Sequence, residues 1–190
     1  MNWKDMIGGQ FGAAIDMLEN AVRACPEHLW SEPAAGGVSF WYTAVHALYF
    51  LDVYLDESEE ACVPPAPFAR EDAGVAARPD RDSPYGERLV AWARLDGLRL
   101  PDRPYARDQV LGYLAHGRAK CQKALAAMTD AEAAAEAGGF PWLGLSRAEL
   151  MLYNMRHVQH HAAQLNLLLR QGVDAAPAWV RRAATPTARA

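Results

Sequence analysis

Two histidines near the C-terminal end of the chain have the spacing of metal ligands. His157 and His161 are four residues apart. On a helix, residues at this separation share one face, with Cβ atoms about 5–6 Å apart, so both imidazoles can direct a nitrogen at one point. His160 points to one side of that pair. The pattern therefore indicates part of a site for zinc or a similar transition metal.

An open metal site usually takes three protein ligands and leaves one position for water or substrate. His46 is the best candidate for the third ligand, because it lies midway along the most apolar segment, beside Ala47 and Leu48, where an uncoordinated imidazole needs another polar partner. Facing helices of a bundle commonly build metal sites in this manner. One alternative stays open: buried histidines are often hydrogen-bonded core residues, and paired histidines also occur on solvated helix faces.

The other residues that could do chemistry are less well placed. His28 follows a helix end, and His116 has no neighbour at ligand spacing. The three cysteines, Cys25, Cys62 and Cys121, are an odd number at wide spacings, which fits neither a disulfide framework nor a paired zinc site. We expect Cys25 and Cys121 to be packing residues, and we expect the chain to reside in a reducing cytoplasm.

Four long helices are expected to position the histidines. Apolar residues recur at intervals of three and four in the segments 5–24, 40–55, 107–128 and 147–171. Ser39 is the expected N-cap of the second helix, Ser146 and Glu149 form a capping box for the fourth, and Gly172 is its expected stop. The pattern predicts an all-α protein built as a four-helix bundle.

The segment between the second and third helices is rich in proline. Seven prolines lie between residues 56 and 104, and only residues 87–95 look helical. We interpret this segment as a long crossover that packs across the outside of the bundle or covers one end of it. Residues 1–183 are expected to form a single domain, and residues 184–190 to form a disordered tail.

Composition narrows the function classes. The chain is 51% hydrophobic and 22% charged, with a formal net charge of −4 and dispersed Lys and Arg residues, so a nucleic-acid partner has little electrostatic support. The N-terminus has no basic region followed by an apolar run, and no stretch approaches the roughly 20 apolar residues that span a bilayer. We expect a soluble protein that is neither exported nor bound to a membrane.

The histidine pattern also resembles that of a known family. A histidine in the second helix, together with the sequence His157-Val-Gln-His160-His161-Ala-Ala-Gln164-Leu in the last helix, is similar to the DinB/YfiT-like superfamily. The first helix and the long connection before the third agree with this resemblance. It implies a bundle in up-down-down-up order, often forming homodimers, with His46, His157 and His161 as ligands of zinc or nickel. His160 matches a position next to the ligands.

The resemblance also implies a type of activity. Members with a known reaction use the metal to bind a low-molecular-weight thiol, such as bacillithiol, mycothiol or glutathione, which then attacks an electrophile or isomerises a substrate. A metal-dependent enzyme of the thiol S-transferase type, acting on a small-molecule substrate, is thus the leading hypothesis. The alternatives are a metal-dependent hydrolase, although no glutamate stands in an HExxH arrangement, and a non-catalytic helical protein that binds a metal or a small ligand.

Residues one turn from the ligands are expected to line the pocket or to support the ligands. They are Tyr42, Tyr49, Tyr153, Asn154, His160 and Gln164. The amides of Asn154 and Gln164 are of interest because they can fix the tautomer of a ligand histidine, whereas Phe50 is interpreted as a core residue. The sequence does not identify a catalytic residue.

Overall fold

The computed structural model describes residues 2–32, 38–68 and 103–183, and this part of the chain is helical. Its four long helices are α1 (Trp3–Ala24), α3 (Phe40–Val53), α5 (Arg107–Ala127) and α7 (Arg147–Val173). Three shorter elements connect them: α2 (Glu27–Ser31), α6 (Asp130–Ala134) and the 3-10 turn η1 (Pro141–Leu143). The described ranges contain no strand. The prediction of an all-α fold is confirmed.

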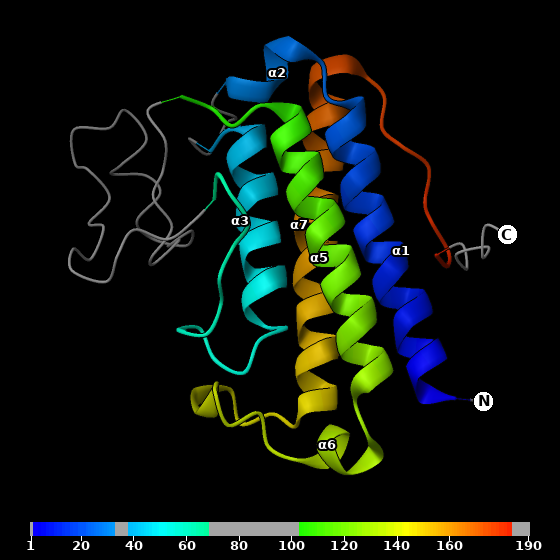
Figure 1. The fold of residues 1–190 in the computed structure, drawn as a ribbon. Helices are drawn as coiled ribbons and strands as arrows, with labels where there is room; N and C mark the ends of the chain where they lie inside the picture. The colour runs from blue at the N-terminus through cyan, green and yellow to red at the C-terminus, as the bar shows by residue number, and fades with distance from the viewer. Residues whose placement is uncertain (1, 33–37, 69–102, 184–190) are drawn as a thin grey trace, which may run out of the picture.

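The four long helices form a bundle. Helices α1 and α3 each pack against both α5 and α7, so α1 and α3 occupy opposite corners. Figure 1 shows that α1 and α7 run in one direction and that α3 and α5 run in the other. Helices α3 and α5 therefore run parallel to each other.

Helix α3 is the most deeply buried of the four. Every one of its residues except Phe50 is buried, and its polar residues Thr43, His46 and Asp52 are enclosed with the rest. Helix α1 instead buries one stripe, which includes Phe11, and leaves its other side to solvent. Each buried polar side chain on α3 needs a partner, because burying it unpaired is unfavourable. Thr43 finds one in its own helix turn, where its hydroxyl donates to the Ser39 carbonyl at 3.2 Å, and Asp52 finds partners on α5.

The start of α7 agrees with the sequence prediction. The Ser146 backbone N–H donates to Glu149 Oε2 at 2.9 Å, and the Glu149 N–H donates to Ser146 Oγ at 3.3 Å. This reciprocal capping box satisfies two amides that have no partner inside the helix. At α3 the outcome differs, because Ser39 occupies the N-cap position but its side chain forms no capping hydrogen bond.

The predicted stop of α7 at Gly172 is wrong. The helix continues to Val173 and ends at Asp174, which adopts the left-handed conformation with φ 53°. Aspartate tolerates this conformation better than most residues with a side chain. Gly172 has a packing role instead, since a Cβ atom there would lie 2.5 Å from Leu29 Cδ1.

Several elements differ from the sequence predictions or lie outside the described residues. Helices α2 and α6 and the turn η1 were not predicted, because elements of three to five residues are too short to show a hydrophobic period. The predicted helix 87–95 and the predicted disordered tail 184–190 fall outside the described residues. Among the helices that are described, none combines the length and apolarity needed to cross a membrane.

Candidate metal centre

The bundle brings the three predicted ligand histidines together. His46 comes from the middle of α3, and His157 and His161 come from successive turns of α7, which packs against α3. One ligand atom from each residue lies within 4.8 Å of the others. The ring centroid of His46 is 4.6 Å from that of His161 and 5.3 Å from that of His157. This is a cluster that could hold one metal ion.

All three imidazoles are neutral at physiological pH. Burial, followed by the neighbouring imidazoles, lowers the pKa of His46 to about 3 and that of His157 to about 3. Burial lowers the pKa of His161 to about 4, although the hydrogen bond that His161 donates to Gln164 acts to raise it. Only a neutral imidazole has a lone pair to give to a metal, so these pKa values leave the ligands ready to bind at pH 7.

The hydrogen bond between His161 and Gln164 fixes which nitrogen can bind the metal. His161 Nδ1 lies 2.7 Å from Gln164 Oε1, and an amide oxygen can only accept, so Nδ1 carries the proton. The lone pair of the neutral ring is therefore on Nε2, which lies 3.1 Å from His157 Nε2. Gln164 thus orients the ring of His161 as an outer hydrogen-bond partner of a metal ligand does.

The donor set fits a zinc-like or nickel-like ion. Two Nε2 atoms meet at 3.1 Å, and the Nδ1 atom of His157 is buried without a hydrogen bond among the described residues. Neutral nitrogen donors suit zinc, nickel and related ions, and they do not choose strongly between them. Because no carboxylate or thiolate belongs to this cluster, an ion bound there would keep its full positive charge.

The aromatic rings of Phe50 and Tyr54 form one wall of the site. The ring centroid of Phe50 lies 4.9 Å from that of His46 and 5.4 Å from that of His157, and the Tyr54 centroid is 6.4 Å from that of His157. Phe50 was interpreted as a core residue, yet it is only half-buried. The spacing of His46, Phe50 and Tyr54, at i, i+4 and i+8, is the signal that could have found both.

The structure separates the predicted pocket residues by position. Tyr153 lies beside Tyr54, with ring centroids 5.4 Å apart, and exposed His160 lies beside His161 at 5.1 Å. Burial, and then Tyr153, raise the pKa of Tyr54 above its usual range. Both Tyr153 and His160 therefore adjoin the histidine cluster.

Asn154, Tyr42 and Tyr49 have other contacts. Asn154 is fully buried and its Nδ2 donates to the backbone oxygen of Leu51 at 3.0 Å, so it ties α7 to α3. The Tyr49 hydroxyl donates to Glu59 at 3.4 Å. The buried ring of Tyr42 packs edge-on against Trp41. Of the two amides considered for tautomer control, Gln164 is thus the one that contacts a histidine nitrogen.

An open groove borders the histidine cluster on the outer face of α7. We call it the α7 groove; it encloses about 690 Å³ and is lined by α1, α7 and the C-terminal segment, with lining residues that include Gln10, Tyr153, Arg156, His157, His160 and Trp179. Ligand pockets commonly enclose about 300–1,000 Å³. His157 belongs to both the groove and the cluster, so the groove adjoins the candidate metal centre at this residue.

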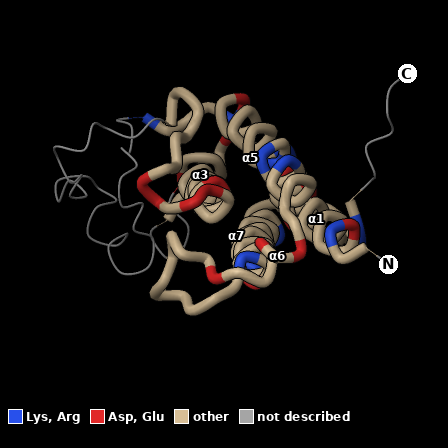
Figure 2. Tube along the Cα trace, turned by 60° about the horizontal axis from the view of Figure 1, so that its bottom comes forward, with Lys and Arg blue, Asp and Glu red and all other residues tan. Residues whose placement is uncertain are grey.

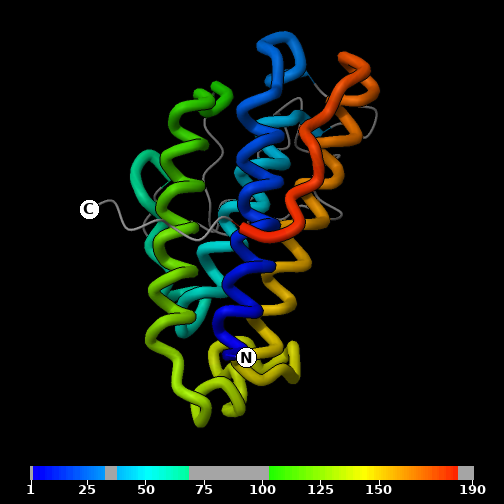
Figure 3. The backbone as a smooth tube through the Cα atoms, turned by 90° about the vertical axis from the view of Figure 1, so that its right-hand side faces the viewer, coloured from blue at the N-terminus to red at the C-terminus, as the bar shows by residue number. Residues whose placement is uncertain are grey.

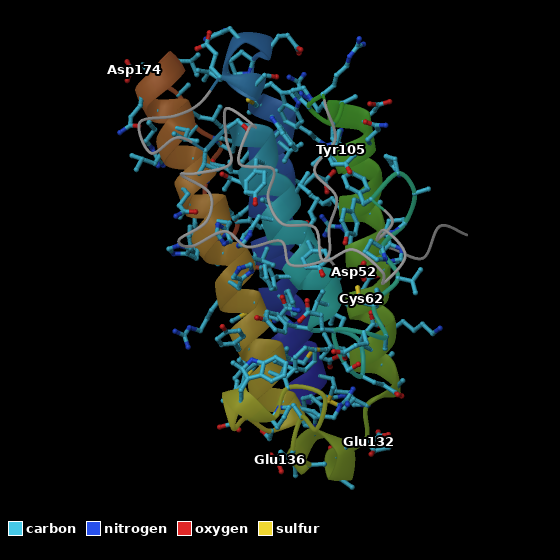
Figure 4. All side chains as sticks on the ribbon, turned by 90° about the vertical axis from the view of Figure 1, so that its left-hand side faces the viewer. Asp52, Cys62, Tyr105, Glu132, Glu136 and Asp174 are labelled. Carbon is cyan, nitrogen blue, oxygen red and sulfur yellow. The ribbon has the colours of Figure 1, made fainter. Side chains whose placement is uncertain are left out.

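A second cluster lies on the opposite side of α3, between α3 and α5. Figure 4 labels Asp52 and Cys62 there, side by side. One ligand atom from each of Asp52, Asp56 and Cys62 lies within 4.8 Å of the others. Figure 2 shows acidic residues gathering in the loop that follows α3. Lys120 Nζ donates hydrogen bonds to the carboxylates of both Asp52 and Asp56, and the Tyr113 hydroxyl donates to Asp52 Oδ2 at 3.1 Å.

The remaining histidines and cysteines lie away from the cluster. His28 is exposed on α2, and His116 Nε2 lies 3.4 Å from Asp52 on the far side of α3. All three cysteines are buried and free, and burial raises the pKa of Cys25 to about 12 and that of Cys121 to about 12. Such thiols remain protonated at neutral pH and are poor nucleophiles.

Comparison with known proteins agrees with this geometry. Residues 10–165 match the family model of the DinB superfamily. This match covers most of the chain, and the protein therefore belongs to the DinB superfamily. No curated protein and no solved structure matches the chain.

Proposed function

We propose that this protein is a metal-dependent enzyme that activates a low-molecular-weight thiol and transfers it to an electrophilic small molecule. The observation that carries this proposal is the convergence of three neutral histidines, two of them buried and His157 half-buried, beside an open groove. A purely structural metal site is closed on all sides, whereas a catalytic site needs access for its reactants. The α7 groove, which His157 lines, supports this proposal because it is open beside one of the three histidines.

The chemistry expected at the site follows from its charges. A divalent ion held by His46, His157 and His161 would lower the pKa of a bound thiol or water and would so supply a nucleophile at neutral pH. Phe50 and Tyr54 pack against the histidines, and Gln164 keeps His161 in the tautomer that presents Nε2. His160 lines the groove and can accept the proton that leaves the thiol.

Thiol transfer is favoured over hydrolysis by the residues around the site. A metal-dependent hydrolase commonly uses a carboxylate as general base near the ion. The described residues that line the α7 groove include no aspartate or glutamate, and none belongs to the histidine cluster. A thiol needs less help from a base than water does, because its pKa is already close to neutral.

The test is turnover by the metal-loaded protein. Zinc-loaded and nickel-loaded samples are each assayed with glutathione, bacillithiol or mycothiol and a panel of aryl halides, epoxides and unsaturated carbonyl compounds. We expect a thiol-consuming rate above that of the metal-free protein, and we expect His46→Ala to abolish it while circular dichroism shows an intact helical fold. Absence of any metal-dependent rate across all thiols would reject the proposal.

A further inference from the structure

The charge of the α7 groove is set by one side chain. Arg156 is the only lysine, arginine, aspartate or glutamate among the described residues that line it. Arg156 also forms no salt bridge with any residue of the described ranges, in contrast to Arg118, which pairs with Asp16 and Glu19. A guanidinium that faces a groove without an internal carboxylate is available to an anionic ligand.

A fixed segment of chain forms one wall of the groove. After α7 the chain turns back and runs along α1, as Figure 3 shows. The Ala183 backbone N–H donates to the Gly9 carbonyl at 2.9 Å, and Gln10 Nε2 donates to the Arg181 carbonyl at 3.1 Å. A Cβ atom at Gly12 would lie 2.6 Å from Ala183 Cβ. Glycine on this face of α1 thus allows the segment to pack closely against the helix.

This segment holds an aromatic ring at the groove. Trp179 lines the groove together with Val180, and 67% of its surface is exposed. The neighbouring Val180 N–H lies 3.2 Å from Met17 Sδ, so the backbone next to the indole is anchored to α1. A large exposed aromatic on an anchored segment offers a flat apolar surface to a ligand.

We propose that the α7 groove binds the second substrate of the reaction, and that this substrate is an anionic molecule with an aromatic or other planar apolar body. Arg156 binds its carboxylate or comparable anionic group, and Trp179 covers its apolar body. His157, which lines the groove and belongs to the histidine cluster, places this molecule beside the metal centre. Naming the ligand a substrate rests on the proposed function; the binding preference itself does not.

Binding is tested on the metal-free, full-length protein with two fluorescent probes. The first is 8-anilinonaphthalene-1-sulfonate, and the second is N-phenyl-1-naphthylamine, which has the same rings without the anionic group. We expect Arg156→Gln to lower the affinity for the sulfonate probe about tenfold, because this probe loses an ion pair. The affinity for the neutral probe should stay unchanged. Trp179→Ala should lower the affinity for both probes.

Arg170→Gln is the matched control, since Arg170 is an exposed arginine of α7 that does not line the groove. It should leave both affinities unchanged. Equal losses for the two probes in Arg156→Gln, or a loss of the same size in Arg170→Gln, would overturn the proposal. Because this measurement needs neither metal nor turnover, it can fail or succeed independently of the thiol-transfer assay.

A competition experiment identifies which reactant occupies the groove. Benzoate should displace the sulfonate probe from the wild-type protein and should do so less well from Arg156→Gln. Displacement by glutathione and not by benzoate would contradict the assignment to the second substrate, because the groove would then hold the thiol.

Discussion

Helix α3 supplies a polar residue to each of two clusters on its opposite sides, and the two clusters are completed differently. On the α7 side, His46 meets two further histidines whose nitrogens converge without any internal cation or carboxylate among them. On the α5 side, Asp52 meets a second carboxylate and a thiol, but Lys120 already binds both carboxylates. Both groups have metal-ligand chemistry, yet only in the acidic cluster does a cationic side chain already bind the ligand atoms.

The difference shows how a buried polar group can be satisfied. Asp52 is fully buried, and the bundle compensates its charge with an ammonium group and a tyrosine hydroxyl. Burial alone would lower the pKa of Lys120, but its hydrogen bonds to Asp52 and Asp56 raise the pKa above its usual value, so the ion pair persists at neutral pH. The charges of the acidic cluster are thus balanced within the chain, whereas the histidine cluster is a neutral group that could hold an ion.

The largest expected effect on stability comes from removing the internal cation. Lys120→Met leaves the buried Asp52 carboxylate without its main partner, and breaking a buried ion pair costs about 3–5 kcal/mol. Because the Lys120 side chain is 21% exposed, we expect a loss of about 2–3 kcal/mol in the free energy of unfolding, measured by urea denaturation.

Lys123→Met provides the control on the same helix, since Lys123 is exposed. It should change the free energy of unfolding by about 0.5 kcal/mol or less. If Lys120→Met lowered the free energy of unfolding no more than this control, the acidic cluster would not depend on its lysine. The proposed difference between the two clusters would then be wrong.

The next largest effect is expected for the zinc affinity of the histidine cluster. Gln164→Leu removes the acceptor that fixes the His161 tautomer. Loss of such an outer partner typically weakens metal affinity 10–100-fold, and we expect a loss in this range when zinc is titrated against a chromophoric chelator. The exposed Gln171→Leu should bind zinc like the wild type. Equal zinc affinities for the wild type and Gln164→Leu would show that Gln164 does not support metal binding.

The smallest effect is expected for the reactivity of the Cys62 thiol, which belongs to the acidic cluster. Burial, and then Asp52, raise the pKa of this thiol, so it should react slowly with a disulfide reagent at pH 8. In a Cys25→Ala/Cys121→Ala background, one equivalent of zinc should leave this rate unchanged. Protection of Cys62 by zinc would mean that the ion enters the acidic cluster.

The sequence predicted the parts of the site that depend on local spacing. His157, His161 and Gln164 lie within eight residues of one helix, so the 3.6-residue period places them relative to each other. His46 could be nominated because a histidine in a segment apolar on all sides needs a partner. The long helices were found for the same reason, since their apolar stripes repeat over many turns.

The parts that were missed depend on contacts between distant segments. The pairing of Lys120 with Asp52 joins α5 to α3, and no local pattern relates the two residues. The placement of Trp179 depends on a return of the chain along α1. Gly172 looked like a helix stop because glycine favours that position, but its contact with Leu29 of α2 decides its role. Such contacts become visible only when the helices are packed together.

The central claim is that the histidines hold the metal ion. Its most direct test is the metal content of untagged protein purified without chelator, compared between the wild type and variants of each cluster. The wild type and Asp52→Asn/Lys120→Met should each hold about one zinc or nickel ion per chain, and His157→Ala/His161→Ala should hold none. A histidine variant that keeps its ion, or an acidic-cluster variant that loses it while remaining folded, would contradict the assignment of the metal site to the histidines.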